Sequence, residues 1–390
     1  MNPQKHAVVV GAGLAGLATA VGLRHVGGWR VTVLESAPEF GPVGSGISMY
    51  PNAMRALAAL GFEEQLNALP PFEVGHQLRA TNGDELTRVD GATVRDLWGG
   101  QIYGFHRAHL HELLRSGLPD DAVRVGVRIT GAAPGPNAKW SVRSHGTTVI
   151  DDADLVIAAD GIDSPLRIQH WPDLPRAVYT GSTAWRGISP FLPEQERSIV
   201  QTFGTGAEFG FLPLTDGRTY WYASAATAPG VREPDERAAL LARYAGWHDP
   251  IPRLIEASDA ILHHDIYALP EVPQSLVSGR LVLVGDAGHA MTPHLGQGGC
   301  TALEDAVVLA SEIASSPDDV DSALTRYDAQ RRPRVSELAQ IAEGIRAHSH
   351  ESGEAGTQER NRTWPLLPAA EIYRTSADVA NWFPPTIVNA

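Results

Sequence analysis

The chain has 390 residues, with 45 acidic side chains against 31 lysines and arginines, and a single cysteine, Cys300. This length allows two or three domains with a large apolar core. The formal net charge of −14 argues against a nucleic-acid or anionic-membrane partner, because both need a basic protein face. One cysteine excludes an internal disulfide and any metal centre built from several cysteines.

An apolar run at residues 7–23 is the one segment that could be mistaken for a signal peptide. Four glycines interrupt this run, and only one lysine precedes it. No other stretch approaches the roughly 18 uninterrupted apolar residues that a membrane span needs. We therefore expect a cytoplasmic protein without a membrane partner.

The first elements in chain order predict a strand, a helix and a second strand. Residues 8–10 are three valines, residues 14–26 are rich in Ala and Leu, and residues 30–34 again carry Val and Leu. Strands joined by a helix in this way lie parallel in one sheet.

The next segments predict short strands and helices. We expect helices at 50–60 and 107–116, each followed by a glycine, and a hairpin at 72–89 that turns at Asn82-Gly83. Residues 123–130 and 140–149 are predicted to be antiparallel strands on either side of a Gly/Pro loop. Residues 155–159 predict a buried strand.

From residue 179 to 226, short alternating runs carry several Trp, Tyr and Phe side chains, which is typical of an antiparallel sheet. Residues 234–248 predict a helix, 281–284 a buried strand of the parallel type, and 303–315 and 320–348 two further helices. Four aromatic residues in the tail predict docking against the protein rather than disorder: Trp364, Tyr373, Trp382 and Phe383.

A Gly-x-Gly-x-x-Gly turn lies between the first strand and helix. Gly11 permits the sharp turn, Gly13 lets the backbone approach a pyrophosphate, and Gly16 lets helix and strand pack closely. The phosphates would rest on the amides at the helix N-terminus. Glu35 ends the second strand, where an acid can accept hydrogen bonds from ribose hydroxyls and favours NAD or FAD over NADP. The alternative is an ordinary glycine-rich turn.

A second glycine-rich segment follows the strand at 281–284. Asp286 comes directly after Gly285 at the strand end, where a carboxylate can accept hydrogen bonds from a polyol. Pro293 and the segment 296–299 then precede a helix whose amides can face a second anion or an electron-rich ring edge. FAD carries both a pyrophosphate and such a ring, so the two segments together favour FAD.

A third motif, Asp160-Gly161, follows the buried strand at 155–159, and on its own it fits a capped turn better. With the other two motifs in this order, residues 6–335 resemble the class A FAD-dependent aromatic hydroxylases, a flavoprotein monooxygenase family with salicylate- and urate-hydroxylase-like members. The resemblance implies an α/β fold, in which a Rossmann-like FAD-binding domain with a mostly parallel, three-layer arrangement is interrupted by an antiparallel-sheet substrate domain.

The expected boundaries follow from this resemblance and from the change in composition. Residues 1–70, 100–175 and 265–345 would form the discontinuous FAD-binding domain. Residues 71–99 and 176–264 would form the substrate-binding sheet domain, and 346–390 a C-terminal tail with helix.

The resemblance also implies which residues contact FAD. Glu35 would hold the adenosine ribose, Arg107 would contact the cofactor from its helix, and the backbone of Val127 would lie at the adenine. Asp286 would bind ribityl or pyrophosphate-proximal oxygens, and Pro293 would lie against the flavin ring. The other expected contacts are Gly11, Gly13, Leu14, Ala15, Gly16, Ser45, Gly46, Asp160, Gly161, Gly296, Gln297, Gly298 and Gly299.

The aromatic-rich sheet is the expected substrate side. Tyr220 and Tyr222 share a face because side chains alternate along a strand, and Arg186 lies in a Trp-Arg-Gly segment that resembles a strand of the family. Tyr220, Tyr222, Arg186 and Pro293 are the candidate catalytic residues; the first three would hold or deprotonate a phenol-type substrate. The alternatives are plain core for the aromatic residues and a surface ion pair for Arg186.

Other candidates are assigned structural roles. For His289 and His294, which flank the Pro293 loop, hydrogen bonding is favoured over a proton relay. Cys300 is expected to be a packing residue, and residues 331–334 an ion-paired helix segment. The histidine clusters lack a set of ligands with metal-binding spacing, so no metal is predicted.

The hypothesised reaction begins with reduction of FAD by NADH or NADPH. O2 would add at C4a, and the flavin hydroperoxide would hydroxylate an aromatic or heteroaromatic small molecule in a closed apolar cavity. The alternatives are an epoxidase, a monooxygenase acting on a polycyclic or polyketide antibiotic, and a non-catalytic flavin-binding protein. A halogenase is disfavoured, because Lys5 and Lys139 lie outside any expected pocket. We expect a monomer or homodimer.

Overall fold

The computed structural model describes residues 4–41, 45–69, 72–191, 198–351 and 353–387. The first of two large sheets has the strand order β17 (Val277–Ser278), β18 (Leu281–Leu283), β11 (Leu155–Ala158), β1 (Lys5–Val10), β2 (Trp29–Leu34) and β7 (Val123–Arg124). All neighbours are parallel except β17 and β18. The turns that follow β1, β11 and β18 therefore meet at one edge of this sheet.

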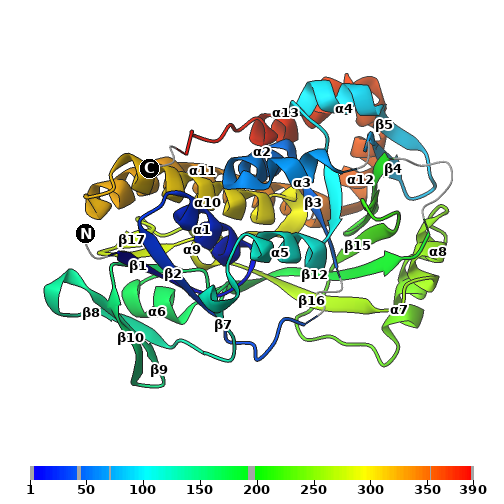
Figure 1. Cartoon of the computed structure of the whole chain (residues 1–390). Coiled ribbons are helices and arrows are strands. Elements are labelled where there is room, and N and C mark those ends of the chain that lie inside the picture. The colour runs from blue at the N-terminus through cyan, green and yellow to red at the C-terminus, as the bar shows by residue number, and fades with distance from the viewer. Residues whose placement is uncertain (1–3, 42–44, 70–71, 192–197, 352, 388–390) are drawn as a thin grey trace.

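Long helices cover this sheet (Figure 1). The helix α1 (Leu14–His25) packs on α10 (Gly298–Ser315), and α10 packs on α11 (Val320–Glu351) and α2 (Pro51–Leu57). At Gly22 of α1, a Cβ atom would lie 3.0 Å from the Cβ of Ala310 in α10. The glycine therefore allows the two helices to approach closely. On the other side of α1 lies α5 (Arg107–Ser116).

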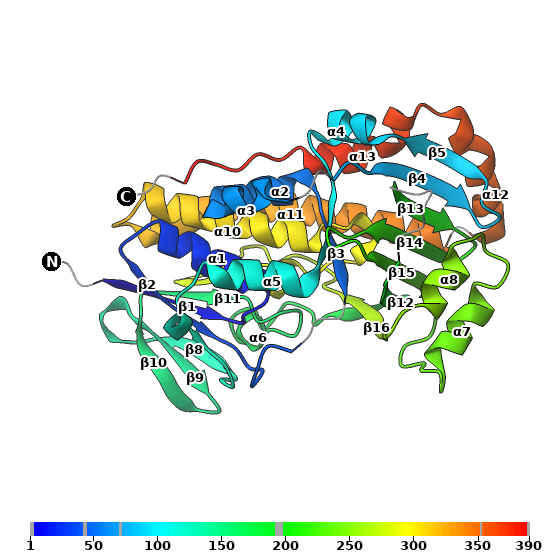
Figure 2. The same cartoon turned by 45° about the vertical axis from the view of Figure 1, so that its right-hand side comes forward.

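The second large sheet has the order β16 (Ile261–Ala268), β12 (Val178–Ser189), β15 (Thr219–Ala226), β14 (Ala207–Pro213), β13 (Ser198–Phe203), β4 (Gly75–Ala80) and β5 (Glu85–Val89). It is antiparallel except between β13 and β4. The helices α7 (Glu236–Arg243) and α8 (Ile251–Glu256) cover one face over an aromatic core that includes Phe209, Phe211 and Trp221 (Figure 2). The opposite face of this second sheet contributes to the candidate active site described below.

Smaller elements complete the fold. One small sheet contains β8 (Gly131–Pro134), β9 (Trp140–Ser144) and β10 (Thr147–Ala153), and another pairs β3 (Gly46–Met49) with β6 (Tyr103–His106). The remaining α-helices are α3 (Glu63–Asn67), α4 (Gly91–Trp98), α6 (Pro165–His170), α9 (Asp286–His289), α12 (Gly353–Thr363) and α13 (Ala369–Ala380). Among the described residues, no helix combines the length and apolar character needed to cross a membrane.

Several element predictions are confirmed. The first strand, helix and second strand form a parallel unit, the hairpin pairs β4 with β5, and the helix at 107–116 matches α5. The strands at 155–159 and 281–284 lie next to each other and parallel in the first sheet, as β11 and β18. The predicted antiparallel sheet at 179–226 is formed by β12 to β15.

The prediction of a strand over 123–130 is wrong. Only β7 forms there, parallel to β2. The regular pairing ends before Gly126, which adopts a φ of +74°, although the amides of Gly126 and Val127 still donate to the carbonyls of Ala37 and Glu35. The partner of β9 is instead β8, in the segment predicted to be a loop, and 140–149 divides into two strands at the turn formed by His145 and Gly146. Strand propensity marks extended segments but does not select their partners.

Three helix boundaries also differ. The helix at 50–60 passes at Ala58 into a π-helical turn, inside which Gly61 has a φ of +93°. The helix expected at 234–248 is limited to α7, whose N-cap is Asp235. The helix expected from residue 303 begins at Gly298, so the glycine segment itself supplies its first turn.

Candidate active site

The first glycine turn shows which of its glycines the fold requires. Gly11 has a φ of +102°, and a Cβ on it would lie 2.3 Å from the carbonyl oxygen of Ala159. A Cβ on Gly16 would lie 1.9 Å from the carbonyl oxygen of Gly11. Apart from Gly13 itself and its two neighbours in the chain, no described residue has an atom within 4 Å of a Cβ built on Gly13, at the N-cap of α1. Gly11 and Gly16 therefore serve internal packing, whereas Gly13 leaves an open approach that fits a pyrophosphate.

Glu35 lies beside this turn. Its carboxylate accepts hydrogen bonds from the amides of Ala12 and Ala37, each at 2.8 Å. The amide of Val127 donates to the carbonyl of Glu35 at 2.7 Å, which brings the predicted adenine-side residue to the same place. Leu14 and Ala15 form the first turn of α1 above it.

Ser45, Gly46 and Arg107 also come together. The amide of Arg107 donates to the carbonyl of Ser45 at 2.9 Å, and Gly46 pairs with His106 across β3 and β6. A Cβ on Gly46 would lie 2.3 Å from the Tyr220 ring. The predicted cofactor segment thus packs directly on the predicted substrate sheet.

Asp160 and Gly161 form the turn after β11. The Asp160 carboxyl is buried, and neither of its oxygens makes a well-aligned hydrogen bond within the described ranges, although the Ser164 hydroxyl and the Leu166 amide lie close enough to favour its charged form. Burial raises the pKa of this carboxyl to about 6. A buried carboxyl with incomplete hydrogen bonding, at the edge where the three turns meet, fits a site completed by a bound ligand.

Asp305 of α10 holds the third turn of this edge. Its carboxylate accepts from the amide of Gly285 at 2.8 Å, contacts His289 Nε2 at 2.6 Å and binds Arg331 Nε at 2.8 Å. Burial would raise the pKa of Asp305, but the charges of His289 and Arg331 outweigh it and hold the pKa below its usual value. Asp286 begins α9 next to this anchor, with its side chain exposed.

The Pro293 loop is fixed to the helices behind it. Gly296 has a φ of +71° and lies against the Tyr50 ring, while a Cβ on Gly299 would lie 2.8 Å from the Ile47 side chain. Gln297 accepts a hydrogen bond from Asn52 at 2.9 Å. Apart from its chain neighbours and the nearby backbone of α10, no described residue has an atom within 4 Å of a Cβ on Gly298, which leaves this helix start open.

A buried polar network supports this loop from below. Asn52 donates to Glu304 at 2.7 Å, and Glu304 binds both Arg331 and Arg334, each at 2.7 Å. The predicted ion pairing of the segment 331–334 is therefore confirmed for two of its arginines. The supporting roles of Asn52, Glu304 and Asp305 were not predicted, although two adjacent acids in an apolar helix are a signal for buried ion pairs.

Tyr220 and Tyr222 share the face of the second sheet that lies opposite α7 and α8, with ring centroids 6.2 Å apart. Tyr222 crosses β14, because a Cβ on Gly210 would lie 2.2 Å from its ring, and its hydroxyl accepts from Gln201 Nε2 at 2.7 Å. Burial raises the pKa values of both tyrosines. At neutral pH they are therefore hydrogen-bonding groups rather than bases.

Arg186 lies on the same face, paired with Tyr222 across β12 and β15. It is half-buried, its guanidinium lies close enough to hydrogen-bond the Tyr220 hydroxyl, and among the described residues no carboxylate forms an ion pair with it. Burial raises the pKa of Tyr220, and the nearby charges of Arg186 and Arg107 oppose this shift. Arg186 is therefore available as a cation on the tyrosine face.

Glu208, His294 and His350 form a cluster at the end of this face that was not predicted. Glu208 pairs with Ser224 across β14 and β15, and its Oε1 lies 3.9 Å from Nε2 of His294, which follows Pro293. The Ser224 hydroxyl lies 3.4 Å from the same nitrogen and 3.1 Å from Nε2 of His350. The three segments are far apart in sequence, so only the fold brings them together.

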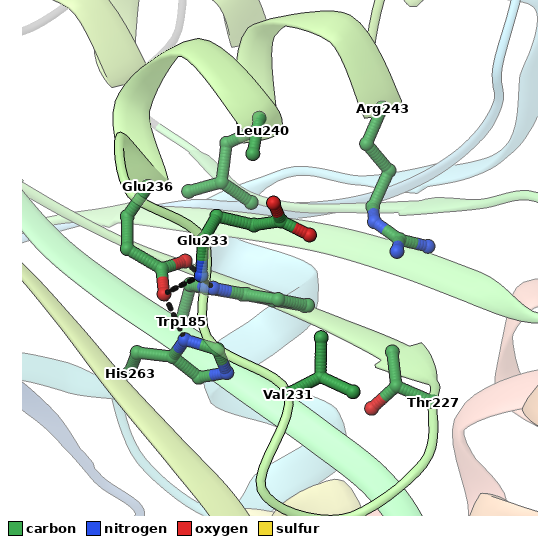
Figure 3. Close-up of a pocket in the computed structure, with 9 residues that line it drawn as sticks. Trp185, Thr227, Val231, Glu233, Glu236, Leu240, Arg243 and His263 are labelled. Atoms are coloured by element: carbon green, nitrogen blue, oxygen red, sulfur yellow. Dashed lines mark hydrogen bonds and ion pairs between the residues drawn. The ribbon is translucent and has the colours of Figure 1, made fainter.

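The opposite face of the sheet carries a separate hollow of about 290 Å³ (Figure 3). Glu236 accepts from Trp185 Nε1 at 2.9 Å and contacts His263 Nδ1 at 2.5 Å. These polar groups satisfy one another beneath α7. The hollow lies on the far side of the sheet from Tyr222, because Trp185 and Arg186 point to opposite faces of β12.

Cys300 is buried at the start of α10, with its Sγ near the carbonyls of Ser48 and Gly296. Burial raises the pKa of this thiol to about 12, so it stays protonated at neutral pH. This agrees with the predicted packing role.

A parallel sheet whose three glycine-containing turns meet at one edge, set against an aromatic sheet face, is the arrangement expected of a dinucleotide-binding oxidoreductase of the flavin type. The chain matches the family model of the FAD binding domain over residues 4–342. It is 36% identical over 357 residues to aurachin C monooxygenase/isomerase of Stigmatella aurantiaca, covering 90% of each chain. It is 32% identical over 383 residues to 2-heptyl-3-hydroxy-4(1H)-quinolone synthase of Pseudomonas aeruginosa, covering 94% of this chain and 95% of that protein.

The structure is also similar to that of Klebsiella pneumoniae HpxO complexed with FAD and uric acid, with a TM-score of 0.89, 28% sequence identity and 97% of each chain covered. The chain belongs to the FAD-dependent aromatic hydroxylase family, and it is an FAD-dependent monooxygenase.

Proposed function

We propose that the protein is a single-component monooxygenase that uses NADH or NADPH and O2 to hydroxylate a heteroaromatic small molecule. The contact between Gly46 and the Tyr220 ring carries this proposal, because it joins the expected cofactor segment to the aromatic sheet face. When bound, FAD supplies the redox chemistry that activates O2. The relatives named for a quinolone and the structure with uric acid support a heteroaromatic ring as substrate.

The chain's own residues would bind and orient both molecules. We assign the diphosphate to the open approach at Gly13, ribose hydroxyls to Glu35, and ribityl or pyrophosphate-proximal oxygens to Asp286. Arg107 would also contact the cofactor. The Pro293 loop and the open helix start at Gly298 would lie against the flavin ring.

On the substrate side, Tyr220 and Tyr222 would exclude water and position the ring. The raised pKa values of the two tyrosines argue against either as a general base, so we assign them hydrogen bonding and packing. Arg186 would polarise an oxygen on the substrate. The division into discontinuous FAD-binding and substrate parts, a cytoplasmic location, and a monomer or homodimer complete the proposal.

The test is NADH and NADPH consumption by the purified yellow holoenzyme with phenols, quinolones, pyridines and polycyclic aromatics, with peroxide and product measured together. We expect consumption stimulated by a heteroaromatic ring and coupled to a hydroxylated product. Consumption that no ring stimulates would contradict the proposal. An epoxide, or a product from a polycyclic antibiotic alone, would replace hydroxylation of a simple heteroaromatic ring as the function.

A further inference from the structure

The Glu208 carboxyl is buried without a donor. Its side chain is 7% exposed, and no described residue donates a hydrogen bond to its carboxyl group. Burial raises the pKa of Glu208 to about 7, although the charge of Arg360 opposes this shift. Buried carboxyl groups are normally hydrogen-bonded, so this group lacks a partner that a ligand could supply.

The neighbouring imidazoles are neutral at the pH where Glu208 can ionise. Burial lowers the pKa of His294 to about 3 and that of His350 to about 4. The Nδ1 atom of His294 is buried and has no hydrogen-bond partner among the described residues. Glu208 therefore has no cation within hydrogen-bonding distance. The cluster instead contains groups that can still form hydrogen bonds, namely the Glu208 carboxyl and Nδ1 of His294.

Glu208 lies on the sheet face that we assign to the substrate, so its unpaired carboxyl can contact a bound ring. It lies two residues before Gly210 on β14, so its side chain shares the face over which the Tyr222 ring crosses. His294, on the other side of the carboxyl, directly follows Pro293 of the loop that we assign to the flavin ring. A planar ring placed against Tyr222 would direct one edge toward Glu208.

A cation is the competing occupant. The ligand atoms of Glu208, His294 and His350 all lie within 4.8 Å of one another. However, both ring nitrogens of His350 already pair with hydroxyls, of Ser182 at 2.7 Å and of Ser224 at 3.1 Å. The charges of Arg346 and Arg360 also act on the cluster. These contacts favour a neutral hydrogen-bond donor over a metal ion.

We propose that Glu208 is a substrate-binding residue that accepts a hydrogen bond from an N–H or O–H group on the edge of a neutral heteroaromatic ring. This rests on the proposed function and narrows its substrate class. Rings with an N–H opposite the reacting edge would be preferred. Above pH 7, where Glu208 is ionised, aromatic carboxylates would be disfavoured at this edge, because two negative charges would face each other.

The experiment compares three probes with the holoenzyme: 4(1H)-quinolone, its N-methyl derivative and quinoline-4-carboxylate. Binding is read from the change in flavin absorbance, without turnover. At pH 8, above the pKa of Glu208, we expect wild type to bind the N–H probe at least about tenfold more tightly than the N-methyl probe, since the N-methyl probe cannot form the hydrogen bond to the charged carboxylate. The carboxylate should bind more weakly still.

The variants test whether Glu208 acts by accepting a hydrogen bond or only by filling space beside the ring. Glu208→Leu should remove the preference for the N–H probe, whereas Glu208→Gln, which keeps an acceptor oxygen, should retain part of it. Glu236→Gln, on the opposite sheet face, is the matched control and should bind all probes as wild type does. Flavin content and thermal midpoint show that each variant is folded.

Equal binding of the N–H and N-methyl probes by wild type, an unchanged preference in Glu208→Leu, or no binding of any probe would overturn the proposal. Stoichiometric zinc in the purified holoenzyme, lost in Glu208→Leu, would overturn it in favour of a metal site. If the binding pattern holds but no ring stimulates NADH or NADPH consumption, the proposed function fails and the binding role of Glu208 stands.

Discussion

At the scale of single residues, burial of Glu208 makes protein stability depend on pH. The folded state holds the proton up to a pKa of about 7, whereas 4.5 is the ordinary value for the unfolded chain. The contribution of Glu208 to stability is therefore fully present below pH 4.5 and is lost as pH rises through 7. Glu208→Gln should remove this loss, which amounts to about 3 kcal/mol over this range.

The measurement is the free energy of unfolding of both proteins at pH 5 and pH 8. The difference between variant and wild type should grow in favour of the variant at pH 8. Tyr222, His294, His350 and Arg360 face the same carboxyl. The lowered pKa values of the two histidines destabilise both proteins below pH 6.5, so this effect largely cancels. A difference that does not change with pH would contradict the assigned burial.

Asp305 is the second residue whose environment makes a strong prediction. Its replacement by Ala would remove the one carboxylate that the Gly285 amide, His289 and Arg331 share as a partner. Breaking such a buried ion pair from one side costs about 3–5 kcal/mol. We expect Asp305→Ala to lower the free energy of unfolding by this amount and to release FAD at a lower temperature.

The matched control is Asp321→Ala, which removes an exposed ion pair with Arg280 at 3.0 Å. Exposed pairs contribute at most about 1 kcal/mol, so this variant should remain near wild type. Equal effects of the two substitutions would show that the Asp305 network does not hold the cofactor edge.

At the scale of elements, the first glycine turn separates folding from cofactor binding. Gly13→Ala places a methyl group where no described residue other than its chain neighbours has an atom within 4 Å, whereas Gly16→Ala places one 1.9 Å from a carbonyl oxygen. We expect Gly13→Ala to leave the thermal midpoint of the apoprotein unchanged and to weaken FAD binding at least about tenfold, since the methyl group would occupy the phosphate approach.

Gly16→Ala should instead lower the midpoint of the apoprotein itself. Fluorescence titration with FAD and thermal unfolding of the apoproteins distinguish the two effects. A Gly13→Ala variant that binds FAD as wild type does would show that the pyrophosphate does not approach at this position.

The elements of the fold differ in how well the sequence predicts them. The glycine turns and Glu35 could be predicted, because each motif is contiguous and follows a strand whose valines and leucines mark it as buried. The prediction at 123–130 failed for a different reason, because the sequence of an extended segment does not determine which strand it pairs with. The edge of β2 accepts two residues of this segment, and the regular pairing ends before Gly126.

At the scale of the whole molecule, the site combines segments that no local pattern connects. Tyr220 and Tyr222 could be placed on one face by their alternation along one strand. Glu208, His294 and His350 could not be grouped, because β14, the Pro293 loop and the end of α11 meet only after both sheets and the long helices have packed together. Likewise, two adjacent acids in α10 gain their partners only when α11 packs beside it.

The C-terminal helix α13 contacts both the second large sheet and a helix that covers the first. Tyr373 of α13 is buried, and its hydroxyl lies 3.0 Å from His76 Nδ1 of β4 and its ring 5.0 Å from that of Trp98 of α4. Arg55 of α2 donates to the carbonyls of Ala380 at 3.0 Å and Trp382 at 2.9 Å. The predicted docking of the aromatic tail is observed for Trp364, Tyr373 and Trp382, which pack against apolar clusters, whereas Phe383 is exposed and contacts Arg55. The helix α13 connects the second sheet to a helix over the first.

Removal of residues 369–390 should therefore destabilise the molecule at both ends of α13. The Tyr373→Ala variant should lower the free energy of unfolding by about 3–5 kcal/mol through the loss of a buried ring. Arg55→Ala should have a smaller effect, because it leaves the buried ring in place. Leu366→Ala, at a side chain that is 77% exposed, is the control and should change little.

Thermal unfolding and limited proteolysis measure these effects together. In the truncated protein, cleavage should appear first near β4, β5 and α4, because their apolar cluster loses the cover of Tyr373, Ala377 and Ala380. Bound FAD should protect this region less than it protects the first glycine turn, since the edge that we assign to the cofactor belongs to the other sheet. A truncated protein with the midpoint and cleavage pattern of wild type would show that α13 lies on the surface without joining the two sheets.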